Sequence, residues 1–161
     1  GPMGFDIGAL IANLYLNYFS HAHQSSAESV NYSQWLLQTI DDLWTKFEAK
    51  FLSLWSEHEQ FSQNTFMGKD SAGDSHQTFR HVFLQQVFSD TLGFAACKII
   101  RRILGVAKVA DFMQFEDQYL RAKLETQALK MATTMLVNRQ AYTNIADVNK
   151  LAKSVSSDTL K

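Results

Sequence analysis

Proline is almost absent from this chain, and that scarcity limits its fold more than any other feature. Among 161 residues there is one proline, Pro2, and there are only seven glycines. These two residue types end helices and form the tight turns between strands. A chain with so few of them has long, uninterrupted elements. Since no alternating strand pattern or hairpin turn signal occurs either, we predict an all-α helical bundle.

Apolar residues recur at the three- and four-residue spacing of helices. The clearest stripe consists of Leu36, Ile40, Leu43, Phe47, Phe51 and Leu54, widened by Trp44 and Trp55. An aromatic stripe at this spacing indicates packed core rather than a cofactor site. We predict one helical domain over residues 1–161, with long helices at 5–19, 33–58, 76–104 and 116–138, a short last helix ending at Leu151 and a frayed tail over 154–161.

Turn residues mark the ends of several predicted helices. Residues 21–32 are polar and serine-rich and are predicted to form a loop. Gly93 is expected at a bend or a close helix contact, and Gly105 at a left-handed helix end. Asn144 or Asp147 could cap the last helix.

The first predicted helix, residues 5–19, is apolar on every side, with Asn13 and Asn17 as its polar breaks. A helix that is apolar all round is buried all round. We therefore expect it to lie inside a larger structure of which this chain is one part.

Composition excludes several classes of partner. Fifteen basic and sixteen acidic residues give a formal net charge of -1, which provides no basic face for nucleic acid and no polybasic segment for a membrane surface.

The single cysteine, Cys97, excludes an internal disulfide and is expected to be buried. No apolar run has membrane-spanning length, and no basic segment marks a signal peptide. These features predict a cytoplasmic protein.

Neither metal nor phosphate-loop chemistry is indicated by the local motifs. His76 and His81 are five residues apart, whereas a helical zinc site needs histidines three or four apart. His21 and His23 are predicted in a loop, so we predict no metal site. Gly68-Lys69 lacks the preceding glycine and following hydroxyl residue of a phosphate loop.

Two sets of charged residues remain candidates for function, the pair of adjacent arginines and one aspartate near the start of the chain. Arg101 and Arg102 are adjacent, so on a helix they point about 100° apart, and one could reach into a cleft while the other faces solvent. Guanidinium groups bind phosphate and sugar oxygens. Alternatively, the two arginines could simply complement the helix dipole at the end of their helix. Asp6 could be a helix N-cap or a buried acceptor that holds a neighbouring loop.

Three segments carry a resemblance to a known family. The opening Gly-Pro-Met-Gly-Phe-Asp-Ile-Gly-Ala at residues 1–9 resembles the segment after the acidic metal-binding motif of methylthioribose kinases. Residues 98–112, Lys-Ile-Ile-Arg-Arg-Ile-Leu-Gly-Val-Ala-Lys-Val-Ala-Asp-Phe, resemble the paired-arginine segment of that family, and residues 121–125 the start of its last long helix. The resemblance runs from Gly1 to near Tyr142. These enzymes are members of the aminoglycoside-phosphotransferase-like branch of the protein-kinase fold.

The resemblance implies an activity and roles for the candidate residues. The family phosphorylates 5-methylthioribose to 5-methylthioribose 1-phosphate in methionine salvage, with ATP and magnesium. By this resemblance Arg101 and Arg102 would bind the sugar and stabilise the transferring phosphoryl group, as phosphoryl transfer requires. Asp6 would accept backbone hydrogen bonds from the catalytic loop.

Other family motifs are not found in this sequence. The catalytic loop, the acidic metal motif and the nucleotide-binding lobe of the family have no counterpart here. We therefore expect the chain to be most of the helical C-terminal lobe of such a kinase, with no catalytic residue, metal ligand or bound cofactor of its own. Alone it is expected to be inactive, with the N-terminal lobe as its missing partner.

An alternative is a non-catalytic helical module, such as the effector domain of a transcriptional regulator. In the kinase, Asp6, Arg101 and Arg102 are expected to converge where the other lobe docks. In the regulator, they are expected to scatter around a bundle with a closed apolar pocket. A truncated gene product kept as a scaffold is a third hypothesis, and the sequence leaves a homodimer open.

Overall fold

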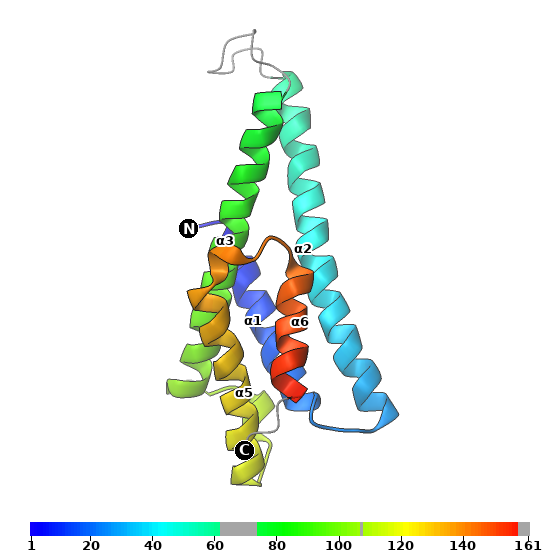
Figure 1. Cartoon of the computed structure of the whole chain (residues 1–161), viewed down its shortest axis with the longest axis vertical. Helices are drawn as coiled ribbons and strands as arrows, with labels where there is room; N and C mark the ends of the chain where they lie inside the picture. The colour runs from blue at the N-terminus through cyan, green and yellow to red at the C-terminus, as the bar shows by residue number, and fades with distance from the viewer. Residues whose placement is uncertain (62–73, 107, 158–161) are drawn as a thin grey trace.

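The computed structural model describes residues 1–61, 74–106 and 108–157 of the chain. Within these ranges the structure contains helices and no strand, which confirms the all-α prediction (Figure 1). The elements are α1 (Gly4–His21), α2 (Ala27–Phe61), α3 (Asp74–Leu104), α4 (Ala110–Met113), α5 (Gln118–Val137), a 3-10 turn (Arg139–Ala141) and α6 (Ile145–Ser157).

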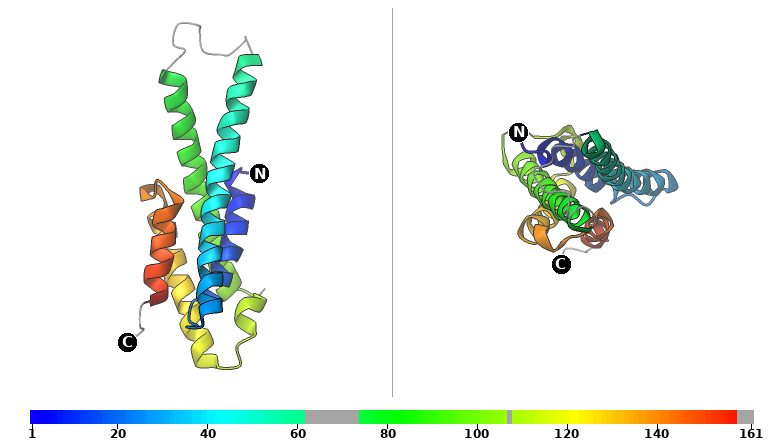
Figure 2. Two further views of the ribbon diagram at one scale, coloured as in Figure 1. Left: turned by 90° about the vertical axis from the view of Figure 1, so that its right-hand side faces the viewer. Right: turned by 90° about the horizontal axis from the view of Figure 1, so that it is seen from above.

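The bundle is built around α1, which contacts α2, α3, α4 and α5. The last helix, α6, packs against α2 and α5. Both long helices, α2 and α3, extend beyond the others and form a two-helix arm (Figures 1 and 2). The largest fully buried side chains lie at the centre of the bundle and include Ile11, Tyr15, Leu16, Phe19, Phe88, Leu92 and Ile99.

The aromatic stripe of α2 forms core, as predicted, at the end near the bundle. Leu36, Ile40 and Trp44 are at most 4% exposed. Further along, the stripe lines the arm, where Phe51 stacks on Phe83 of α3 with ring centroids 6.0 Å apart. Leu54 is 41% exposed, because no other described helix covers that part of the arm.

α1 packs closely against α3. A Cβ atom on Gly4 would lie 2.7 Å from the Thr91 nitrogen, and one on Gly8 would lie 2.5 Å from the Thr91 carbonyl oxygen. The same added atom on Gly8 would lie 3.1 Å from the Ala95 nitrogen. The two helices therefore run parallel, and the backbones approach so closely only because both positions of α1 lack a side chain.

A buried hydrogen-bonded link ties three helices together. The Tyr15 hydroxyl donates to the Asn149 Oδ1 atom at 2.8 Å, and the Asn149 Nδ2 atom donates to the Leu37 carbonyl oxygen at 3.1 Å. Burial raises the pKa of Tyr15 well above its usual range, so this phenol stays a donor. α1, α2 and α6 are thus joined by one satisfied polar network.

Breaking that network should weaken the bundle. We expect Asn149→Ala to lower the free energy of unfolding by about 2–4 kcal/mol, because it leaves the Tyr15 hydroxyl and the Leu37 carbonyl unpaired in the interior. Urea unfolding followed by circular dichroism measures this change. Asn31→Ala, at an exposed position of α2, is the control and should stay within about 0.5 kcal/mol of the wild type. Equal effects of the two changes would contradict this role of Asn149.

Several predicted helix ends were wrong. α2 begins at Ala27 rather than Ser33, because Ser26 starts the turn by accepting a bond from the Ser29 nitrogen at 3.2 Å. α6 continues to Ser157 rather than ending at Leu151, because Val155 is only 3% exposed and packs in the core.

The glycine and cap predictions had mixed outcomes. No described glycine has a positive φ, so Gly105 does not end α3 in a left-handed conformation. A side chain at Gly105 would instead collide with the Arg101 carbonyl oxygen. Asn144 does cap α6, since its Oδ1 atom accepts from the Asp147 nitrogen at 2.9 Å. Gly68 and Lys69, which were excluded above as a phosphate loop, lie outside the described residues.

The expectation that α1 is buried all round was wrong for this chain. Met3, Phe5 and Leu10 are 47%, 52% and 47% exposed. One side of α1 packs against its neighbours, while the side bearing Met3 and Leu10 faces solvent. No helix in the described ranges is long and apolar enough to cross a membrane.

Candidate functional site

Arg101 and Arg102 lie in the last turn of α3 and point in different directions, as their spacing predicts. Arg102 is half-buried and lines a surface cleft of about 590 Å³, whereas Arg101 is exposed on the outer side of the helix. We call this space the Arg102 cleft. It is open to solvent and is lined by Asn13, Leu14, Asn17, Tyr32, Trp35, Leu36, Arg102, Lys108, Val109, Ala110 and Asp111.

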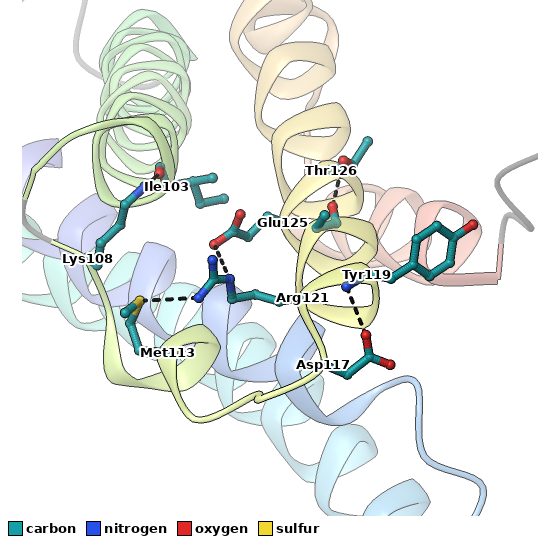
Figure 3. Close-up of polar contacts among 9 residues, drawn as sticks. Ile103, Lys108, Met113, Asp117, Tyr119, Arg121, Glu125 and Thr126 are labelled. Atoms are coloured by element: carbon teal, nitrogen blue, oxygen red, sulfur yellow. Dashed lines mark hydrogen bonds and ion pairs between the residues drawn. The ribbon is translucent and has the colours of Figure 1, made fainter.

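One wall of the Arg102 cleft is the connection between α3 and α4. Asn17 of α1 holds this connection by donating from Nδ2 to the Asp111 Oδ1 atom at 2.7 Å. Lys108 donates from Nζ to the Ile103 carbonyl oxygen at the end of α3 (Figure 3). This cation therefore satisfies a carbonyl at the negative end of the helix dipole.

The beginning of α5 contacts α4, which forms part of the same wall. Arg121 of α5 approaches Met113 of α4, with Nη1 4.0 Å from the sulfur atom, and its Nε lies 3.8 Å from Glu125 Oε1 (Figure 3). Asp117 caps α5 by accepting from the Tyr119 nitrogen at 2.8 Å. These contacts fix where α4, and with it Asp111, stands against α1.

An aromatic pair forms the opposite wall. Tyr32 and Trp35 of α2 are stacked, with centroids 5.7 Å apart and planes 17° apart. The His21 ring meets Tyr32 edge-on at 4.9 Å. Trp35 is 56% exposed, so a flat apolar surface faces a cleft whose other groups are mostly polar.

Positive charge concentrates at the end of α3. Burial lowers the pKa of Lys98, and the nearby charges of Arg102 and Arg101 lower it further. Repulsion among these cations favours an anion beside them. In the cleft itself, Arg102 and Lys108 outnumber the single acid Asp111, so a phosphate or a hydroxyl-rich ligand suits the site.

Asp6 lies away from the Arg102 cleft. It is exposed in the first turn of α1, and Met3 rather than Asp6 occupies the N-cap position. Asn13, which lines the cleft, lies on the same side of α1 as Asp6. Seven residues of helix separate them, which is two turns or about 10 Å along the axis. Arg102 therefore lies in the cleft, Arg101 beside it and Asp6 apart, so the expected convergence of these three residues is not found in the structure. The roles predicted for them stay predictions.

The other candidate residues have structural positions. Cys97 was expected to be buried but is exposed, because its position faces away from the helices that cover α3. His21 is the last residue of α1 rather than part of a loop. Among the residues that the structure describes, no group of three or more metal-ligating side chains comes together.

Comparison with known proteins shows what the chain resembles. It is similar to part of a group of kinases and matches no protein-family model. The relatives are methylthioribose kinases. Methylthioribose kinase 2 of Oryza sativa subsp. japonica is 36% identical over 98% of this chain, and the enzyme of Escherichia coli O45:K1 is 36% identical over 95%. The methylthioribose kinase of Geobacillus sp. is 31% identical over 94% of this chain.

The family resemblance predicted from the sequence is thereby confirmed. The chain spans 38% of the rice protein and 37% of the bacterial protein. Nearly all of this chain therefore corresponds to little more than a third of each relative. The comparison favours the kinase hypothesis over the effector domain of a regulator.

Sequence reasoning missed most of the Arg102 cleft. Asn17 was noted only as a polar break in an apolar helix, and Trp35 was not noted at all. A usable signal existed, because an exposed tryptophan just before a buried stripe and a carboxamide on an apolar helix are both unusual. The contact of Asn17 with Asp111, however, joins residues 94 positions apart in the sequence.

Proposed function

We propose that this chain is the substrate-side helical part of a cytoplasmic methylthioribose kinase. The parent enzyme would transfer a phosphoryl group from ATP, with magnesium, to the anomeric hydroxyl of 5-methylthioribose in methionine salvage. The observation that carries the proposal is 36% identity with methylthioribose kinase 2 of rice across 98% of this chain.

The geometry at the end of α3 supports a role in that reaction. Phosphoryl transfer needs positioning and positive charge around the transferring group. Arg102 in the cleft and Arg101 beside it can supply that charge, while the carboxamides of Asn13 and Asn17 offer hydrogen bonds to sugar hydroxyls. Catalytic base, magnesium ligands and ATP site would come from the remainder of the kinase, and the isolated chain would be inactive.

The exposed side of α1 supports a docking role for this helix. Met3, Phe5 and Leu10 are each about half exposed on the helix that carries Asp6. Met3 and Leu10 share one side of this helix, whereas Phe5 lies on another side and packs edge-on against Phe94 of α3. Exposed apolar side chains on one side of a helix commonly mark a contact surface. In the parent, this face would pack against the catalytic loop, and Asp6 would accept its backbone hydrogen bonds.

Polar replacement of this face should expose less apolar surface in the isolated chain and weaken the fold of the parent. In the isolated chain, Met3→Ser with Leu10→Ser should reduce the binding of a hydrophobic fluorescent dye, because both side chains are about half exposed. In the full-length kinase the same pair should lower the melting temperature by a few degrees, at about 2 °C or less per kcal/mol lost for a protein of that size. Val82→Ser, on the exposed side of the arm, is the control. A full-length kinase unaffected by the α1 changes would argue against docking there.

Binding of the sugar tests the proposed function. We expect calorimetric titration of the full-length kinase to show saturable binding of 5-methylthioribose. The isolated chain should bind it at least about tenfold more weakly, since it offers only part of the contacts. If the full-length protein does not bind this sugar, the proposed function is wrong.

A further inference from the structure

We propose that the groove between α2 and α6 binds a free α-amino acid with an apolar side chain. Two adjoining spaces of about 480 and 180 Å³ form this groove, which we call the α2–α6 groove. Gln34, Leu37 and Lys153 line both spaces. No residue of their lining belongs to the Arg102 cleft, so this site is independent of the proposed kinase reaction.

The floor of the α2–α6 groove is fixed by the buried network described above. Asn149 lines the larger space, accepts from the Tyr15 hydroxyl and donates to the Leu37 carbonyl oxygen. The pKa of Tyr15 is raised mainly by burial and further by the charges of Tyr18 and Asp41, so the Asp41 carboxylate lies near this network. Because Asn149 is already engaged, a ligand would find its charged partners in the side walls.

Asp41 supplies the negative charge of one wall. It is half-buried and lines the larger space. Among the residues that the structure describes, its carboxylate accepts no hydrogen bond and pairs with no cation. The adjacent Asp42, by contrast, is bound by Lys46 and Gln38. A half-buried carboxylate without a partner favours a cation beside it, such as an ammonium group.

Lys153 supplies the positive charge of the other wall. Its side chain is exposed, and within the described ranges its ammonium group pairs with no carboxylate. Lys150, one turn earlier on α6, is instead paired with Asp147 at 2.8 Å. Lys153 is therefore the cation of this groove that is available to a carboxylate ligand.

The directions of the two helices bring these opposite charges toward each other. α2 and α6 run antiparallel (Figure 1), and the bond between Asn149 and Leu37 aligns them. Asp41 and Lys153 each lie four residues beyond that bond, so their backbones are about 12 Å apart along the axes. Side chains on a helix lean toward its N-terminus, so these two lean toward each other. The space between them suits a molecule that carries both charges.

The smaller space suits an apolar side chain. Ala22, Val30 and Leu37 contribute to its walls together with the ring of Tyr18, whose hydroxyl is occupied by Ser156 at 2.9 Å. A cavity of about 150 Å³ holds a benzene molecule, so a space of about 180 Å³ accommodates an aliphatic group. A ligand whose carboxylate is bound by the lysine shared between the two spaces can place its side chain here.

The test measures the binding of L-leucine to the full-length protein by saturation-transfer difference NMR, which detects weak ligands. We expect saturable binding with a dissociation constant of about 1 mM or below. Two analogues each lack one charge: L-leucinamide has no carboxylate, and 4-methylpentanoate has no ammonium group. Glycine keeps both charges but has no apolar side chain. Each of the three should bind at least about fivefold more weakly than leucine.

Two variants assign the two charges. Asp41→Asn should weaken leucine binding by about tenfold or more and leave 4-methylpentanoate unchanged, since that acid offers no ammonium group. Lys153→Gln should weaken leucine by a similar factor and leave leucinamide unchanged. Glu48→Gln, on α2 outside the groove, is the control and should change neither. Melting temperatures verify that the three variants are folded.

Three results would overturn the proposal. The first is that leucine shows no saturable binding to the full-length protein. The second is that folded Asp41→Asn and Lys153→Gln variants bind leucine as tightly as the wild type. The third is that 4-methylpentanoate binds as tightly as leucine, which would indicate a simple anion site without a role for the acidic wall.

Discussion

Replacing Gly8 by valine should unfold the bundle or lower its stability by about 3 kcal/mol or more. The first added carbon would lie 2.5 Å from the Thr91 carbonyl oxygen and 3.0 Å from Phe94 Cβ. Two of the atoms it meets belong to the backbone of α3, so no side-chain rotation can relieve the contact. α1 would have to move away from α3, and the core between them would open.

Even Gly8→Ala should be destabilising, although alanine favours a helix over glycine by about 1 kcal/mol. A matched control is Gly93→Ala in the middle of α3. There the added carbon would meet the Arg139 Nη1 atom at 2.8 Å, which is the end of a flexible side chain that can move aside. This variant should be neutral or slightly stabilising. Chemical denaturation of the isolated chain measures both, and equal stabilities would contradict the close packing of α1 on α3.

Replacing Arg102 by glutamine should lower the kcat/KM of the full-length kinase for methylthioribose by about 100-fold or more. The change removes a positive charge from the Arg102 cleft while keeping a polar, uncharged side chain that can donate and accept hydrogen bonds. Arg102→Lys should recover only part of the activity, because an ammonium group lacks the two-pronged geometry that binds phosphoryl oxygens.

The control for charge removal is Lys46→Gln. Lys46 is exposed on α2, pairs with Asp42 at 2.8 Å and does not line the Arg102 cleft. It should leave kcat/KM within about twofold of the wild type. Melting temperatures of both variants separate loss of fold from loss of function. A correctly folded Arg102→Gln enzyme with nearly normal kcat/KM would exclude Arg102 from the reaction.

The helices were predictable because they depend on local spacing. The stripe from Leu36 to Phe51 and the near absence of proline require only neighbouring residues to be read. Helix ends were less accurate, since Val155 extends α6 through a contact with the core that the sequence does not display. The Asn144 cap was predictable because its partner is three residues away.

Burial and the cleft were not predictable from local pattern. Cys97 and Leu10 are apolar residues in apolar runs, yet both are exposed, because burial depends on which sides the neighbouring helices cover. The Gly4–Gly8 contact with α3 links residues more than eighty positions apart, and neither glycine was noted as a packing site. Arg101 and Arg102 were found through family resemblance and helical geometry, while the aromatic wall facing Arg102 needed the fold.

The central claim is that the protein containing this chain phosphorylates 5-methylthioribose. Phosphorus NMR of the full-length protein with ATP, magnesium and the sugar tests it most directly, because an anomeric phosphate is distinguished from ATP and from free phosphate by its coupling to the sugar proton. We expect 5-methylthioribose 1-phosphate to accumulate as ATP is consumed. Absence of a sugar phosphate, or phosphate on a different hydroxyl, would contradict the account.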